Sequence, residues 1–286
     1  MSPRSGGTGP LGRRAAPIGA LRRLARSSRE RERQGAFVAD GVRLLEEAVG
    51  RGAAIRLALT SSRLEREPRG RALAKALGER AARCCEATEE AIAAILGMER
   101  HQGVVAEIER RLHPLASILG QPSRPPLLVA CGVQDPGNLG SLLRVAAAAG
   151  GGGLLATSGT ADPWNPKAVR GSAGAIFHLP VAAGLEGTEM LHELGRASYT
   201  PVMAVASGGT PHFRIDWRRP VALVLGSEGA GVPPELRGLI SESVSLPMAA
   251  AVESLNVLAA AAVLLYEAAR WRGLPGGRPW ATRARG

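Results

Sequence analysis

The sequence predicts an α/β protein of two domains, and three observations support that prediction. The chain has 286 residues, enough for two domains that each have a core of their own. Short apolar runs of strand length alternate with helix-like segments along most of it, which is typical of α/β folds. The stretch 120–126 reads GQPSRPP, and its two consecutive prolines cannot lie inside a helix or a central strand. This stretch therefore separates the two halves.

The first half reads as a small α/β domain over 18–114. A run of arginines over 21–34 predicts a basic helix, whose charged side we interpret as solvated. Residues 1–17 are rich in Arg, Gly and Pro and lack the apolar stretch of a secretory signal, so we expect a disordered basic tail. The pattern predicts strands over 37–40, 55–60 and 104–108, and helices over 42–49, 71–77 and 89–96.

The second half reads as a parallel-sheet domain over 127–273, after a linker over 115–126. The continuous apolar run 127–133 predicts a buried parallel strand. Alternating strands and helices predict a sheet covered on both faces, with ligands at the carboxyl ends of its strands. Further strands are predicted over 154–157, 176–181, 202–206, 221–225 and 243–246, and helices over 139–149, 188–197, 233–240 and 255–271. We expect 274–286 to be a second disordered tail.

The charge balance favours a polyanionic partner. The net charge is +11, and residues 1–114 hold 22 Arg or Lys against 14 Asp or Glu, whereas 115–286 hold 14 against 11. A basic excess concentrated in one domain suits nucleic acid, although a solvated basic surface explains the charge equally well. The three cysteines form no C-x-x-C pair, so we predict neither a disulfide framework nor a zinc site and expect a reducing cytoplasm. No apolar run has the length of a membrane span.

A first polar segment follows the strand predicted over 127–133. Asn138 is a good helix N-cap, and Arg144 lies about 200° around the helix from Leu142, so it points away from the core. Gly137 and Gly140 share the face of Arg144 and are expected to leave open space beneath the guanidinium. Such a place suits a phosphate or a carboxylate. A capped helix with a surface arginine is the simpler alternative.

A second segment, GSEGAGVP over 226–233, follows the strand predicted over 221–225. It lacks the Lys-Ser/Thr of a phosphate-binding P-loop, and its glycines do not have the dinucleotide spacing. Glu228 would repel a triphosphate and suits a cationic ligand or proton transfer. A generic tight turn is the alternative.

A third segment places Ser254 and Asn256 at the start of the long apolar helix. A hydroxyl, a carboxamide and free backbone N–H groups at one helix N-terminus suit an anionic or polar ligand. The alternative is that Ser254 only caps this helix and Asn256 lies on its exposed side. Each alternative holds for one segment alone, but three such segments in one domain favour a shared site.

In order and spacing, these segments resemble the SpoU (TrmH-type) family of the SPOUT RNA methyltransferases. The family patterns N-x-G-x-x-x-R, G-x-E-x-x-G and P-M-x-x-x-x-x-S-L-N-V correspond to Asn138, Gly140 and Arg144, to Gly226, Glu228 and Gly231, and to Pro247, Met248 and 254–257. Segment 162–175 looks like the family's intermediate segment, and 37–41 with 101–106 looks like its substrate-binding domain. The resemblance covers roughly 30–275.

The resemblance implies methyl transfer from S-adenosylmethionine, without a metal, to a ribose 2′-hydroxyl in RNA, with 23S ribosomal RNA as the expected substrate. It implies a SPOUT domain with a deep trefoil knot, which sequence physics alone would not suggest, preceded by an RNA-binding α/β domain. It also implies a cytoplasmic homodimer without membrane contact, whose site is completed across the interface. The implied catalytic residues are Asn138, Arg144, Glu228, Ser254 and Asn256, and the implied cofactor-binding residues are Leu225, Gly226, Gly231, Leu246, Met248 and Leu255.

Within that implied site the roles differ. The counterpart of Arg144 has been proposed in the family as the base, but arginine stays protonated in proteins, so we expect a clamp on a neighbouring phosphate. Asn138, Ser254 and Asn256 would fix the hydroxyl. Glu228 would orient Asn138 or Arg144, or receive the proton through water.

Other functions stay open from the sequence. They are a tRNA ribose methyltransferase, a non-catalytic RNA-binding protein on the same scaffold, and an α/β enzyme acting on phosphate-bearing metabolites. The chain departs from the family pattern at Ala250, where Gly is usual, and at Asp40, where Glu is more usual.

Overall fold

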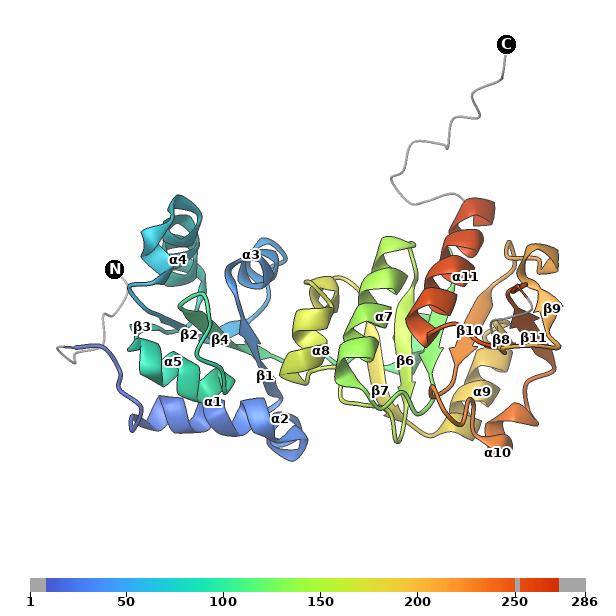
Figure 1. Cartoon of the computed structure of the whole chain (residues 1–286), viewed down its shortest axis with the longest axis horizontal. Helices are drawn as coiled ribbons and strands as arrows, with labels where there is room; N and C mark the ends of the chain where they lie inside the picture. Colours follow the sequence, from blue (N-terminus) through green and yellow to red (C-terminus); the bar gives the residue numbers. More distant parts are fainter. Residues whose placement is uncertain (1–8, 250–252, 273–286) are drawn as a thin grey trace, which may run out of the picture. The chain divides into compact units, whose positions relative to one another are not determined.

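The structure, a computed structural model, describes residues 9–249 and 253–272. The chain divides into one unit of Met1–Arg111 with Trp164–Arg170, and a second of Leu112–Pro163 with Gly171–Gly286. None of the described helices is long and apolar enough to cross a membrane. Figure 1 labels the elements of both units.

The first unit is a four-stranded mixed sheet between two helical layers. Strand order is β1-β4-β2-β3, with β4 antiparallel to both neighbours and β3 parallel to β2. Helices α1 and α5 pack on one face, and α3 and α4 lie together on the other (Figure 1). The elements are α1 (Ala16–Arg26), α2 (Ser28–Gln34), β1 (Ala36–Asp40), α3 (Val42–Gly50), β2 (Ile55–Thr60), η1 (Leu64–Arg66), α4 (Pro68–Arg80), β3 (Cys84–Glu86), α5 (Glu89–Leu96) and β4 (Val104–Glu109).

Residues 164–170 group with this first unit although they follow β6 in the chain. Arg170 forms an ion pair of 2.9 Å with Asp40 at the end of β1. The Arg110 guanidinium lies 4.4 Å above the ring of Trp164. Asp40 is thus the anion that fixes Arg170.

The second unit is a seven-stranded sheet in which every recorded pairing is parallel. Strand order is β7-β6-β5-β10-β8-β11-β9, which confirms the predicted parallel sheet. The elements are α6 (Leu115–Leu119), β5 (Leu127–Ala130), α7 (Pro136–Ala148), β6 (Gly153–Thr157), η2 (Ala175–Phe177), β7 (Val181–Leu185), α9 (Gly187–Arg196), β8 (Thr200–Ala204), β9 (Thr210–Pro211), η3 (His212–Arg214), β10 (Val221–Leu225), α10 (Pro234–Arg237), β11 (Glu242–Ser245) and α11 (Val257–Arg272). Helix α8 (Pro166–Gly171) follows β6 in the chain, but its residues 166–170 group with the first unit.

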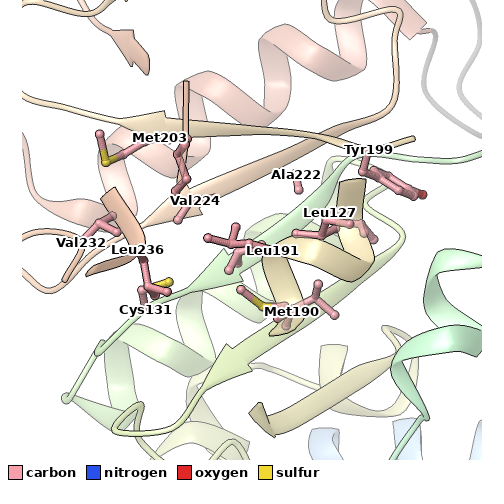
Figure 2. Packing of buried hydrophobic residues seen from close by; sticks show 14 of the residues in the cluster. Leu127, Cys131, Met190, Leu191, Tyr199, Met203, Ala222, Val224, Val232 and Leu236 are labelled. Atoms are coloured by element: carbon pink, nitrogen blue, oxygen red, sulfur yellow. The ribbon is translucent and has the colours of Figure 1, made fainter. Parts of the chain in front are cut away.

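The core of the second unit lies on both faces of this sheet. Helices α7 and α11 pack together on one face. On the other, Leu127, Val224 and Met203 from three neighbouring strands meet Leu191 of α9 and Leu236 of α10 (Figure 2). All five residues of β10 are buried, as expected for a central strand that is apolar throughout.

Cys131 belongs to the same core. It is 1% exposed, and burial raises the pKa of its thiol to about 11. The thiol therefore stays protonated at neutral pH and acts as a small apolar side chain.

The structure corrects several predicted boundaries. The basic helix expected over 21–34 is two helices, because Ser27 ends α1 and accepts a hydrogen bond from the Glu30 N–H as the N-cap of α2. Residues 9–17 of the expected tail are structured in part, since Leu11 pairs with Ala87 and α1 begins at Ala16; 1–8 and 274–286 lie outside the described residues. The expected linker 115–126 contains α6.

Two strands differ from the prediction. The strand expected over 176–181 is wrong: residues 175–177 form a 3-10 turn after Gly174, which has a φ of 98°, and β7 begins at Val181, after Pro180. Proline has no N–H for the middle of a strand, which explains this start. The strand expected to reach residue 133 ends at Ala130, because Gly132 adopts a φ of 69°. Helix α8 and strands β3 and β9 were not predicted.

Candidate functional site

One pocket of about 540 Å³ lies where β8, β10 and β11 end and α11 begins. The carboxyl ends of parallel strands are the usual place for a ligand in such a sheet. The pocket is lined by residues of 203–206, 225–232 with Arg237, 244–248, and 254–264. Segments from four parts of the chain therefore meet around it.

The glycine-rich loop after β10 forms one wall. The Ser227 N–H donates to the Gly231 carbonyl and the Gly231 N–H donates to the Ser227 carbonyl, both at 3.0 Å, which closes a tight turn. A Cβ on Gly226 would lie 2.0 Å from the Gly231 carbonyl carbon, so only glycine fits there. Gly231 has a φ of 70°, a left-handed conformation that also favours glycine. The G-x-E-x-x-G spacing is thus a backbone requirement of this turn.

The carboxylate of Glu228 joins this loop to two helix N-termini. Its Oε1 accepts a hydrogen bond of 2.5 Å from Asn138 Nδ2, near the start of α7, and one of 3.3 Å from Asn256 Nδ2, at the start of α11. These residues are 90 and 28 positions away from Glu228 in the chain. The three polar segments singled out in the sequence therefore meet at one oxygen atom, and of the two predicted partners of Glu228 the structure selects Asn138.

The side-chain amides of Asn138 and Asn256 differ in how many of their polar atoms form hydrogen bonds. Asn256 also accepts a hydrogen bond of 2.8 Å at Oδ1 from the Leu258 N–H, so both ends of its amide are fixed. Asn138 donates through Nδ2, which orients its amide, and among the described residues its Oδ1 has no partner. A fixed amide with an open oxygen can accept a hydrogen bond from a ligand hydroxyl.

The structure places most of the predicted site residues together. The predicted cofactor-binding residues all line the pocket: Leu225, Gly226, Gly231, Leu246, Met248 and Leu255. Of the predicted catalytic residues, Glu228, Ser254 and Asn256 line it, and Asn138 reaches it through Glu228. Ala250 lies outside the described residues.

Arg144 is the exception. It is exposed on α7, does not line the pocket, and makes no hydrogen bond or ion pair with another described residue. It follows Asn138 by six positions, which places it about 120° around the helix from Asn138. Its guanidinium is therefore free for a ligand that approaches α7 from another side.

Two expectations around α7 are wrong. The N-cap of α7 is Asp135, whose side chain accepts a hydrogen bond of 2.9 Å from the Asn138 N–H, and Pro136 occupies the first turn. Gly140 is buried, and a Cβ on Gly171 would meet its Cα at 3.5 Å, so the glycine face of α7 is packed and does not leave open space.

Two parts of the pocket were missed by sequence reasoning. Arg237 lines the pocket and donates from Nη2 to the Val232 carbonyl at 3.0 Å, which supports the glycine-rich loop. No motif or spacing in the sequence indicates that Arg237 belongs to the pocket. The segment 203–206 also lines the pocket, and its place at the end of a predicted parallel strand was a usable signal.

Comparisons with known proteins agree with this arrangement. The SpoU rRNA Methylase family matches residues 125–266, and the MRM3-like substrate binding domain matches residues 16–106. An uncharacterized tRNA/rRNA methyltransferase of Synechocystis sp. is 32% identical over 255 residues, covering 87% of this chain and 89% of that protein. The 23S rRNA (guanosine(2553)-2′-O)-methyltransferase RlmP of Bacillus subtilis is 31% identical over 84% of this chain and 91% of its own length.

A solved structure is similar over nearly the whole chain. It is that of the SpoU methyltransferase AviRb of Streptomyces viridochromogenes in complex with the cofactor AdoMet. It superimposes with a TM-score of 0.82 at 31% identity and covers 91% of this chain and 98% of that one.

We predict that Gly226→Ala destabilises the second unit by about 2 kcal/mol, because its Cβ would collide with backbone of the turn. Thermal unfolding followed by circular dichroism measures the effect. Gly229→Ala is the matched control, since a Cβ there would meet nothing within 4 Å and should leave Tm within about 1 °C. Equal Tm values for the two variants would contradict the prediction.

Proposed function

Because the chain belongs to the SpoU rRNA methylase family, we propose that it methylates a ribose 2′-hydroxyl of 23S ribosomal RNA with S-adenosylmethionine as methyl donor. The observation that carries the proposal is the Glu228 carboxylate, which gathers the three family motifs at one pocket. The names of the relatives support the reaction and the RNA.

The pocket suits this donor. Its volume of about 540 Å³ lies in the range of small-molecule sites. Leu225, Leu246 and Leu255 supply apolar surface, and the turn around Gly226 supplies backbone polar groups. Glu228 supplies a negative charge to a ligand that carries a positive sulfonium. When bound, S-adenosylmethionine provides the electrophilic methyl group.

The residues of the chain must hold the ribose hydroxyl and help its proton to leave. The open Oδ1 of Asn138 accepts the hydrogen bond of the hydroxyl, which directs the oxygen lone pair toward the donor. Asn256, fixed by Glu228 and Leu258, positions Glu228 rather than the substrate. Ser254 lines the pocket and offers a second hydroxyl contact. The proton leaves to Glu228 through a water molecule.

Arg144 serves a different role in this proposal. Its exposed guanidinium carries no partner among the described residues and suits a bidentate contact with a phosphate of the RNA backbone. Such a clamp positions the ribose but exchanges no proton, since arginine is effectively always protonated.

The proposal also includes the oligomeric state, a homodimer, and the location, the cytoplasm. An exposed apolar stripe on α11 includes Val263, 44% exposed, and Tyr266, 49% exposed, which supports a two-fold interface between copies of the chain. The meeting of the β8, β10 and β11 loops at one pocket suits a knotted chain path. We expect the enzyme to act in the cytoplasm, where ribosomal RNA is modified.

Methyl transfer tests the function. We expect the purified chain to transfer tritium-labelled methyl groups from S-adenosylmethionine to protein-free 23S rRNA, and mapping of 2′-O-methylation to find one modified nucleotide that is absent without the protein. Bulk tRNA is the control substrate and should accept no label. Transfer to tRNA alone would contradict the proposal that 23S rRNA is the substrate. No transfer to either RNA would favour a non-catalytic RNA-binding protein.

We predict that Arg144→Ala lowers kcat by at least about 100-fold while the Kd for S-adenosylmethionine, measured by calorimetry, changes less than about 3-fold. The cofactor pocket does not include Arg144, so its loss affects only the RNA. Arg144→Lys keeps the positive charge but lacks the planar guanidinium that makes two parallel hydrogen bonds, so it should recover part of the activity. Full turnover by the alanine variant would remove Arg144 from the site.

A further inference from the structure

The outer face of α1 carries three exposed arginines. Arg22, Arg23 and Arg26 fall within an arc of about 100° on this helix, and all three are exposed. None makes a hydrogen bond or an ion pair with another described residue. We name these three residues the α1 arginine face. The opposite side of α1 is buried in the core through Ile18, Leu21 and Leu24.

Three arginines elsewhere in the first unit are neutralised by acids. Arg69 pairs with Glu46 at 2.5 Å, Arg63 pairs with Glu89, and Arg56 lies 3.8 Å from Glu107. Helix α1 itself contains no acidic residue, and the nearby Glu30, which also interacts electrostatically with Arg23, forms its ion pair with Arg33 at 2.6 Å. Three positive charges therefore lie close together on one side of this helix, with no acidic residue of α1 beside them.

Local contacts hold the face in place. Only Ser27 separates α1 from α2, and its N–H donates to the Arg23 carbonyl at 2.9 Å. The Arg31 side chain is 2% exposed and donates from Nη1 to the Leu24 carbonyl at 2.7 Å, which ties α2 to the end of α1. A cationic face on a fixed helix loses little freedom when it binds a ligand.

We propose that the α1 arginine face binds the phosphate backbone of a double-helical segment of the RNA substrate. Guanidinium groups suit phosphate, and the identity of this polyanion as RNA rests on the proposed function. Residues 16–34 contain no aromatic side chain on which an unpaired base could stack, which favours a duplex over a single strand. A membrane surface is disfavoured because the apolar side of α1 is already buried.

The salt dependence of binding tests this surface directly. The triple variant Arg22→Gln, Arg23→Gln, Arg26→Gln removes three cations that lie in solvent. Binding to a 20-base-pair RNA duplex of unrelated sequence and to protein-free 23S rRNA is measured by fluorescence anisotropy between 50 and 300 mM KCl. We expect the plot of log Kobs against log [KCl] to become less steep by about 2–3, because each lost phosphate contact removes about 0.9 from the slope.

A matched control removes the same charge from another side of the unit. Arg66→Gln, Lys75→Gln and Arg80→Gln change three exposed cations on η1 and α4, and should alter the slope by less than about 0.5. Replacing the three α1 arginines by lysine should keep the wild-type slope. Circular dichroism confirms that each variant is folded.

Three results would overturn the proposal. They are an unchanged slope in the glutamine variant, an equal change in the control variant, and a loss confined to binding of anionic lipid vesicles. The binding assay contains no S-adenosylmethionine, so its outcome is separate from that of the methyl-transfer assay. If the wild-type protein binds the duplex as expected but transfers no methyl group, the proposed function is contradicted and the proposed RNA-binding surface is not.

Discussion

The carboxylate of Glu228 is the group on which the site depends. It accepts hydrogen bonds from the side-chain amides of Asn138 and Asn256, which enter from the N-termini of two different helices. A single anion with two amide donors fixes the loop after β10 against α7 and α11 and decides which way both amides point. The open oxygen of Asn138 follows from this bridge, because its nitrogen is already committed to Glu228.

The parallel sheet and the glycines make that bridge possible. The carboxyl ends of parallel strands lie at the same edge of a sheet. The segments that follow β8, β10 and β11 therefore meet at one pocket. The turn closed by Ser227 and Gly231 leaves no room for a Cβ at Gly226 and projects Glu228 outward. Arg237 holds the same loop through the Val232 carbonyl. The site is thus built from backbone geometry first and side chains second.

Regular elements and short motifs could be read from the sequence, and long-range packing could not. The strands over 55–60 and 221–225 and the helix over 89–96 agree with prediction because their apolar patterns are decided locally. The strand expected over 176–181 failed because Gly174 and Pro180 overrode an apolar run. The grouping of 164–170 with the first unit and the place of Arg237 depend on contacts between distant segments, which no local pattern encodes. Asn138 was correctly singled out, but its expected role as N-cap belongs to Asp135.

The most direct test of the bridge is a double-mutant cycle between Asn138 and Glu228, scored by kcat for methyl transfer to 23S rRNA. If Glu228 acts by orienting Asn138, Asn138→Ala and Glu228→Ala should each lower kcat, and the double variant should be no slower than the slower single variant. Gln134→Ala, at an exposed residue of the segment between β5 and α7, provides the control for local disturbance. Effects of the two single substitutions that simply multiply in the double variant would contradict the account.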